Sequence, residues 1–271
     1  MNLKRTKANL VGYQTLESLQ TQLRVLYALL ARELLTRYGR HNIGFVWLFA
    51  EPMLFTLGIA WLWSLAKAAA MPGVSVAAFA LTGYSSVLVW RNATTRSTQA
   101  VSTNWALLYH RIVTPMDLYL ARITLEVVAA TGSFLVLSIV FVAVDWMQPP
   151  TDLLKVLTAW CLLVAFSYGF GLLIGALAAA SETIERLWHI LTYLLFPVSG
   201  AAFMAHWLPQ EARDAVLWLP MVHGVEMLRS GWFGTAVQTY ESPRYLAVVS
   251  MVLFAAGALV VRRDGRNVEP H

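Results

Sequence analysis

The stretch "RELLTRYGRHNIGFVWLFAEP", from Arg32 to Pro52, decides the fold class of this chain. It opens with a basic cluster and becomes apolar and aromatic within a few residues. Basic residues beside an apolar run are typical of the cytoplasmic flank of a membrane span. We therefore expect the first span to begin here, anchored to the inner leaflet by Arg32, Arg37, Arg40 and His41.

The composition of the whole chain agrees with a membrane protein. Of its 271 residues, 58% are hydrophobic and 13% are charged, whereas about 25% of the residues of a soluble domain are charged. The net charge of +5 does not indicate nucleic-acid binding, because the basic residues gather at the ends of apolar runs. The sequence has no GxxxxGK[ST] loop, no HExxH pair and one cysteine, Cys161. We expect no catalytic site, metal or cofactor in this chain.

Six segments are long and apolar enough, or nearly so, to cross a hydrocarbon core, which needs about 20 helical residues. The predicted fold is an all-α integral membrane protein with one transmembrane domain over residues 1–271. The expected spans are 43–66, 77–101, 119–144, 153–178, 188–206 and 245–261.

The orientation follows from the basic residues that flank these spans. With a cytoplasmic N-terminus, twelve lysines and arginines lie in cytoplasmic segments and four in outer segments. Since positive charge is retained inside, we expect both termini, residues 1–42 and 262–271, to be cytoplasmic.

An apolar stripe precedes the first span, at Leu16, Leu19, Leu23, Leu26 and Leu30. Steps of three and four residues predict an amphipathic helix. We expect this helix to lie in the cytoplasmic membrane interface; the alternative is a helix packed on its own protein.

Residues 207–244 differ from the other connections. Two apolar pieces, each too short to span, are separated by Pro220. This pattern predicts a re-entrant helical hairpin on the outer side, which must be sheltered by protein, or else an amphipathic surface loop. We expect the hairpin to act as an outer gate, with Trp218, Pro220, His223, Glu226 and Arg229 as its candidate residues.

The end of the second span, "WRNATTRSTQAVSTN", is the most polar membrane segment. An arginine near mid-membrane costs about 2.5–3.5 kcal/mol on insertion scales, and helical spacing places these side chains on one broad sector. One interpretation is a wall of a conduit for an anionic substrate; the other is an arginine that reaches the cytoplasmic surface while hydroxyls join helices. The candidate conduit residues are Trp90, Arg91, Asn92, Thr95, Arg96 and Gln99.

Taken together, the stretch from Arg32 to Pro52, the loop "NWALLYHRIVTPMDLYLARI" and the segment "HGVEMLRSGWFG" resemble capsular polysaccharide export permeases. These are the KpsM-like membrane subunits of ABC transporters. The similarity covers nearly the whole chain, but relatives often have Phe-Pro where this chain has Thr114-Pro115.

The resemblance implies a homodimeric channel in the bacterial inner membrane above two copies of a separate ATPase, which would bind ATP and Mg. Lipid-linked polysaccharide would pass outward between the two permease copies, and periplasmic and outer-membrane export proteins are further implied partners. The family's coupling helix falls on about residues 104–112, with Asn104, Trp105, Leu108, Tyr109, His110 and Arg111 as the candidate contacts.

Three other readings compete with this one. An O-antigen or teichoic-acid exporter would have the same transporter architecture but would carry a different polymer. An ion-coupled secondary transporter predicts an internal inverted repeat, and none is evident between residues 1–135 and 136–271. A membrane enzyme would cluster His, Asp or Glu residues, which this sequence does not do.

Overall fold

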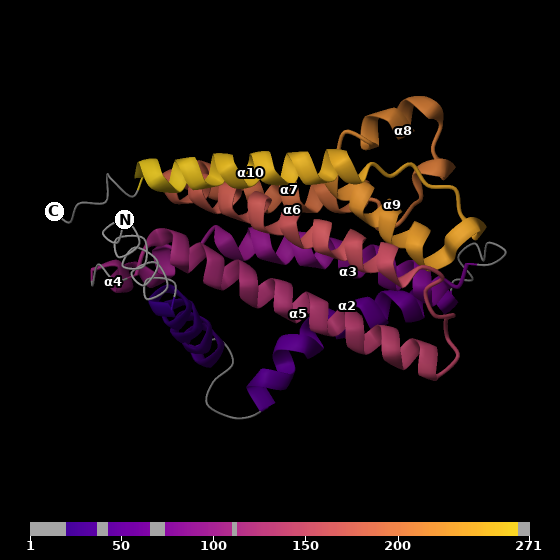
Figure 1. Ribbon diagram of the computed structural model, residues 1–271, viewed down its shortest axis with the longest axis horizontal. Coiled ribbons are helices and arrows are strands. Elements are labelled where there is room, and N and C mark those ends of the chain that lie inside the picture. The colour runs from indigo at the N-terminus through magenta and orange to yellow at the C-terminus, as the bar shows by residue number, and fades with distance from the viewer. Residues whose placement is uncertain (1–19, 37–42, 66–73, 110–112, 265–271) are drawn as a thin grey trace, which may run out of the picture.

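The computed structural model describes residues 20–36, 43–65, 74–109 and 113–264, and within these ranges the regular structure is helical (Figure 1). An unlabelled helix covers residues 20–36. The long helices are α2 (Ile43–Leu65), α3 (Val76–Ser97), α5 (Pro115–Ala143), α6 (Leu153–Ala180), α7 (Glu182–Val198) and α10 (Pro243–Asp264). The short helices are α4 (Trp105–Leu108), α8 (Gln210–Val216) and α9 (Pro220–Phe233), with 3-10 turns η1 (Ser102–Asn104), η2 (Ala205–Trp207) and η3 (Gly234–Ala236).

Four of these helices are long and apolar enough to cross a membrane: Val46–Leu65, Pro115–Ala143, Leu153–Ala180 and Pro243–Arg263. The expectation of an all-α membrane protein is confirmed at this level. Of the other two expected spans, α3 carries the polar stretch at its end and α7 has only 17 residues. The six-span arrangement and the re-entrant hairpin stay predictions.

The fifth expected span, residues 188–206, is displaced in the structure. Its helix, α7, begins at Glu182 and ends at Val198. Pro197 lies inside the last turn, and Gly200 adopts a φ of 87°, which favours glycine. The chain therefore leaves the helix early, and the residues that follow form a turn and η2.

Local sequence explains where the two longest helices begin. Thr114 caps α5: its Oγ1 accepts a hydrogen bond from the Asp117 amide, while the Asp117 carboxylate accepts one from the Thr114 amide at 2.9 Å. This is a capping box, and Pro115 at the first helical position reinforces it. Asp152 caps α6 by accepting from the Lys155 amide at 2.9 Å.

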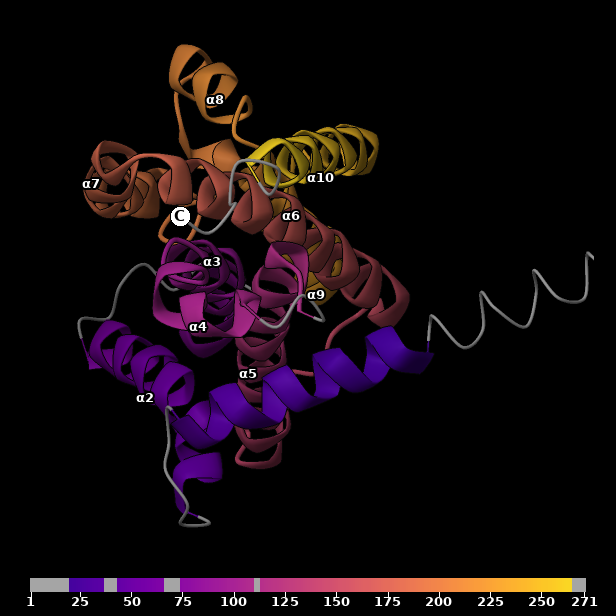
Figure 2. The same ribbon diagram turned by 90° about the vertical axis from the view of Figure 1, so that its left-hand side faces the viewer.

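Helix α3 lies near the centre of the bundle, where it packs against α2, α5, α6 and α9 (Figure 2). The GxxxG step of α6, at Gly171 and Gly175, allows a close approach to α3 and α5. A Cβ added at Gly175 would lie 2.8 Å from Ser97 Cβ and from a ring carbon of Tyr119, and the Tyr119 hydroxyl donates to the Gly175 carbonyl at 3.2 Å. The two glycines of this step, Gly171 and Gly175, therefore have a packing role.

The helix of residues 20–36 lies across one end of the bundle, near α4 (Figure 2). Leu26, Leu29 and Leu30 pack against Leu118 of α5, whereas Leu23 is 65% exposed. Leu16 and Leu19 lie outside the described residues. The predicted stripe is therefore used in part for packing on the protein itself.

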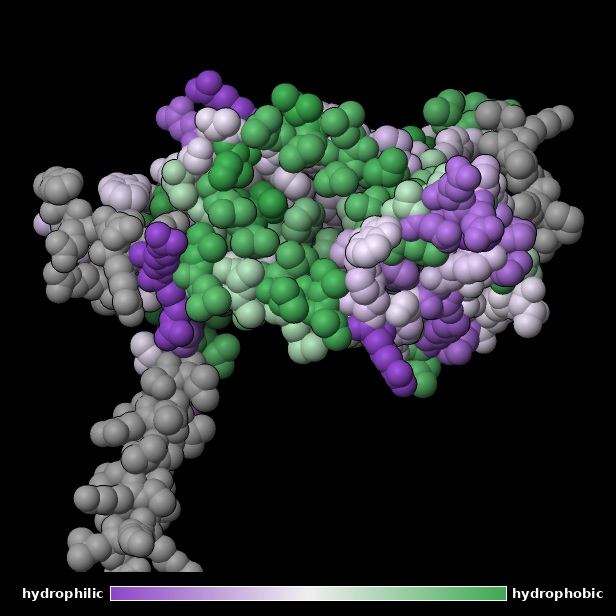
Figure 3. All heavy atoms as spheres, turned by 90° about the horizontal axis from the view of Figure 1, so that it is seen from above, coloured by the Kyte–Doolittle hydropathy of each residue, from purple (hydrophilic) through white to green (hydrophobic). Residues whose placement is uncertain are grey.

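The surface has the polarity of a membrane protein. Figure 3 shows an apolar band across the middle of the face that carries α10, with hydrophilic residues at both ends. Large exposed apolar side chains continue this band on α2, α7 and α10, for example Trp61, Leu194 and Met251. Helices α8 and α9 lie at one end of the bundle and α4 at the other (Figure 1).

Candidate functional site

The polar sector of α3 divides between two neighbouring helices. Arg91 faces α7, where its guanidinium lies 5.3 Å from the ring centre of Tyr193 and 5.5 Å from that of Phe196. Gln99 also faces α7 and donates to Glu185 at 3.3 Å. Arg96 faces α5 instead.

Arg96 belongs to a group of charges that we call the inner polar cluster: Arg32, Glu33, Arg96, Arg122 and Glu126. Arg96 Nε lies 3.8 Å from the nearly buried Glu126 carboxylate, and Arg122 Nε lies 2.9 Å from Glu33. The cluster borders a cavity of about 270 Å³. A carboxylate therefore partners Arg96 within the chain, which favours the structural interpretation for this residue.

Trp90 requires a correction. Its side chain is fully buried in the protein, 6.2 Å from the ring of Phe170, in a cluster with Phe166 and Trp188. One step along a helix turns the side chain by about 100°, so Trp90 faces the core while Arg91 faces α7. Trp90 therefore lines no surface of this chain, whereas Asn92 and Thr95 are partly exposed.

Several buried polar atoms near the α3–α7 contact have no hydrogen-bond partner among the described residues. They are Trp90 Nε1 and Thr95 Oγ1 of α3, and Trp188 Nε1 and Thr192 Oγ1 of α7. An unpaired buried polar group costs about 1–3 kcal/mol. The contact between α3 and α7 therefore buries several polar groups together.

Sequence reasoning missed the contribution of α7 to this site. Glu185, Trp188 and Thr192 share one face of the helix by their spacing of three and four residues. In α7, Trp188 and Thr192 are the buried residues. That spacing could have indicated that these side chains share one face of α7, but it does not indicate which helix packs against that face.

The expected coupling segment forms η1 and α4 at the end of the bundle that carries the 20–36 helix. Trp105 is 57% exposed and Tyr109 is 78% exposed, while Leu108 packs beside Leu29 and Leu118. His110 and Arg111 lie outside the described residues, as do Arg37, Arg40 and His41 of the predicted anchor.

Two side-chain hydrogen bonds tie the 20–36 helix to this segment and to the start of α5. Arg32 donates to the buried Asn104 side chain at 2.7 Å, and Gln22 donates to Asp117 at 2.8 Å. Arg122 also donates to Thr103 at 2.7 Å. Because of these hydrogen bonds, a displacement of η1 and α4 would also pull on the 20–36 helix and on α5.

Residues 24–233 of the chain match the family described as ABC-2 type transporter. The chain belongs to this family.

Three relatives show how far the similarity of this ABC-2 transporter chain extends. It is 43% identical over 254 residues to the capsule polysaccharide export inner-membrane protein CtrC of Neisseria meningitidis serogroup B, covering 94% of this chain and 96% of the relative. It is 42% identical, with the same coverage, to the capsule polysaccharide export inner-membrane protein BexB of Haemophilus influenzae. It is 28% identical to the polysialic acid transport protein KpsM of Escherichia coli, covering 87% of this chain and 91% of the relative.

These matches confirm the predicted resemblance. The ABC-2 domain is the membrane permease part of an ABC transporter, a transmembrane subunit without a nucleotide-binding domain. The chain is an inner-membrane protein with several candidate membrane spans. Membership of this family also implies a partner ATPase.

The residues expected to form an outer gate have a different environment in this ABC-2 permease. His223, Glu226 and Arg229 lie at three-residue steps on α9 and are all buried, whereas Trp218 is 78% exposed and Pro220 begins the helix. Each of the three buried side chains makes hydrogen bonds with backbone groups of neighbouring segments, and these contacts stabilise the fold.

The hydrogen bonds of His223 determine which of its two ring nitrogens carries the proton. The Ser242 amide can only donate, so His223 Nδ1 accepts that hydrogen bond at 3.1 Å. Nε2 then carries the proton and donates to the Leu217 carbonyl at 2.8 Å. Glu226 accepts from the amides of Ala205 and Tyr240 at 3.1 and 3.2 Å. Two loops are thereby tied to α9.

Arg229 closes the turn that follows α7. Its guanidinium donates to the carbonyls of Gly200, Ala201 and Phe203 and lies 3.9 Å from the ring centre of Phe79. A Cβ at Gly83 would lie 2.3 Å from the Ala201 carbonyl oxygen, so this turn also packs tightly on α3.

An ion pair between α6 and the loop before α10 completes this end of the molecule. Lys155 Nζ lies 2.7 Å from the Glu241 carboxylate and donates to Ser230 at 2.6 Å. Burial acts to raise the pKa of Glu241, but hydrogen bonds, first among them the one from Lys155, hold that pKa below its ordinary value. The contact therefore stabilises the fold at neutral pH and is lost as the pH falls through the lowered pKa.

Proposed function

We propose that this chain is the transmembrane subunit of an ATP-driven exporter that moves lipid-linked capsule polysaccharide across the bacterial inner membrane. The observation that carries the proposal is the 43% identity to a capsule polysaccharide export protein across nearly the full length of both chains. The second candidate is an exporter of O-antigen or teichoic acid, because such an exporter would have the same kind of permease and ATPase and differ in its cargo.

A complementation experiment tests the cargo. Expression of this chain with its own ATPase in a capsule-forming strain that lacks its native permease and ATPase should restore polysaccharide to the cell surface. Surface polysaccharide would be measured with a capsule-specific antibody. Accumulation of all polysaccharide inside the cell, with the permease present in the membrane, would contradict the proposal.

The proposed assembly contains two copies of this chain and two of the ATPase, with six spans in each copy. Exposed apolar residues on α2 and α7, such as Trp61 and Leu194, would be covered by the second copy. In this arrangement Arg91, Asn92, Thr95 and Gln99 would line the passage, with Arg91 meeting an anionic group of the cargo. The polar groups buried at the α3–α7 contact support a passage wall that can change shape.

We further propose that both termini are cytoplasmic and that η1 and α4 dock on the ATPase. The exposed Trp105 and Tyr109 support this contact, and the bonds from Gln22 and Arg32 would carry the motion into the 20–36 helix. Trp218, at the other end of the bundle, would face periplasmic or outer-membrane partners.

Cysteine cross-linking tests both the docking and the orientation. In a Cys161→Ser background, Tyr109→Cys is expected to cross-link to the co-expressed ATPase. Trp218→Cys is a matched control, because both side chains are 78% exposed but lie at opposite ends of the bundle. Cross-links from position 218 to the ATPase, or from position 109 only to periplasmic proteins, would reverse the proposed topology.

A further inference from the structure

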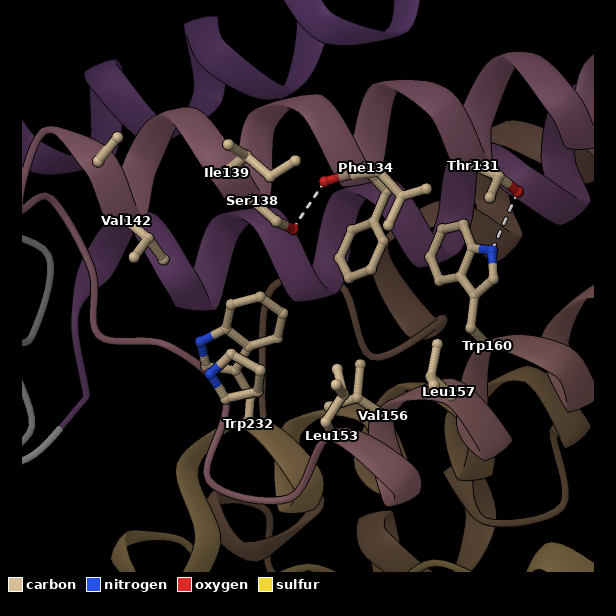
Figure 4. A pocket seen from close by; sticks show the side chains of 13 residues that line it. Thr131, Phe134, Ser138, Ile139, Val142, Leu153, Val156, Leu157, Trp160 and Trp232 are labelled. Carbon is tan, nitrogen blue, oxygen red and sulfur yellow. Dashed lines mark hydrogen bonds between the residues drawn. The ribbon is translucent and has the colours of Figure 1, made fainter.

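An apolar groove lies between α5 and α6 at the end of the bundle that carries α9 (Figure 4). Its volume is about 530 Å³. Phe134 and Trp160 stack at 4.3 Å on its inner wall, and Trp232 of α9 closes one side with its ring centre 6.0 Å from that of Phe134. Three helices therefore contribute to one hollow surface.

The polar atoms around this groove already have partners. Ser138 donates to the Phe134 carbonyl at 2.6 Å, and Trp160 Nε1 donates to the Thr131 hydroxyl at 3.0 Å. Trp232 Nε1 donates to the Gln148 carbonyl at 3.1 Å. A polar occupant would gain little hydrogen bonding here, whereas an apolar one loses nothing.

The groove continues toward the middle of the bundle. A second cavity of about 620 Å³ shares Thr131 and Trp160 with the first and reaches Val127. From Val127 to Val142 along α5 is roughly 22 Å at about 1.5 Å per residue. That length exceeds half of a hydrocarbon core of about 30 Å, so the combined groove is long.

We propose that this groove binds one acyl chain of a membrane phospholipid. Both of its walls, α5 and α6, are candidate membrane spans, and its rim residues Leu135, Ile139 and Leu157 are 50–69% exposed. A second copy of the chain is a poorer occupant, because α2 and α7, which carry the exposed Trp61 and Leu194, lie on the side of the bundle opposite α9, which closes the groove (Figure 2). A helix about 10 Å wide also fits a groove between two packed helices less well than a single hydrocarbon chain does.

The bound chain would do more than fill space. It would contact the Phe134–Trp160 stack and Trp232 together, and so join α5, α6 and α9. The phospholipid would thereby stabilise the outer segment whichever cargo the transporter carries, and this inference goes beyond the proposed function.

Photo-labelling tests the proposal. The purified permease–ATPase complex would be placed in nanodiscs containing phosphatidylethanolamine with a diazirine in one acyl chain, and labelled peptides would be mapped by mass spectrometry. We expect several-fold more label on residues 131–142 and 153–160 than on the exposed face of α10, represented by Val248, Met251 and Val252.

Two variants of α5 make the test specific. Ser138→Phe fills the groove and should abolish the excess label, while Val136→Phe, at a lipid-facing position outside the groove that is 43% exposed, should retain it. Label spread evenly over all lipid-facing helices would overturn the proposal. So would an unchanged excess in Ser138→Phe, or disulfide cross-links from Leu157→Cys that join two copies of the chain.

Discussion

Arg229→Gln is expected to remove most of the folded permease from the membrane. The fully buried guanidinium donates to three carbonyls of the turn after α7, and glutamine cannot reach all three. Each buried acceptor left without a partner costs about 1–3 kcal/mol, so the loss is several kcal/mol against a typical stability of about 5–15 kcal/mol. The amount of detergent-extracted, monodisperse protein measures it.

Two other variants give this experiment its controls. Arg213→Gln removes a partly exposed arginine whose contacts are a hydrogen bond to Tyr240 at 3.3 Å and the face of that ring at 4.6 Å, and it should leave protein levels nearly unchanged. Arg229→Lys should give an intermediate protein level, because lysine keeps the positive charge but lacks the planar guanidinium with its several donors. Normal levels of Arg229→Gln with selectively lost export would support the gating interpretation.

A deletion of residues 207–234 would be a poor test of gating. It would remove α9, whose residues from Met221 to Arg229 are buried against the other helices. Such a variant is expected to fail in folding, so a loss of export would carry no information about a lid.

Arg91→Gln is expected to reduce export by about tenfold or more, equivalent to about 1.4 kcal/mol, while the permease still inserts and binds its ATPase. Among the described residues, the Arg91 guanidinium lies over the rings of Tyr193 and Phe196, and glutamine keeps much of that packing. Arg91→Lys should retain part of the export because the charge remains. Surface polysaccharide, normalised to the amount of assembled complex, is the measurement.

Arg96 provides the comparison for Arg91. Because Arg96 lies beside Glu126, Arg96→Gln should lower protein levels and export in parallel. Exchange of the two charges, Arg96→Glu with Glu126→Arg, should recover part of the protein lost in either single variant. Parallel loss of protein and export in Arg91→Gln would instead make Arg91 a structural residue.

The positions of the long helices could be predicted from the sequence because hydrocarbon accepts only long apolar helical runs. Five of the six expected spans coincide with helices to within a few residues, and α5 begins at the Thr114–Asp117 capping box, which is a local feature of the sequence. The resemblance carried by the stretch from Arg32 to Pro52 and the two later segments also led to the correct family.

The roles of the polar side chains were decided only by the tertiary structure. Helical spacing places Arg91 and Arg96 on one broad sector of α3, but it cannot say that α7 lies opposite the first and Glu126 of α5 opposite the second. The same limit applies to Trp90, which faces the core, and to Arg229, which binds the turn after α7. Periodicity determines which side chains share a face, whereas the packing of distant segments determines what that face contacts.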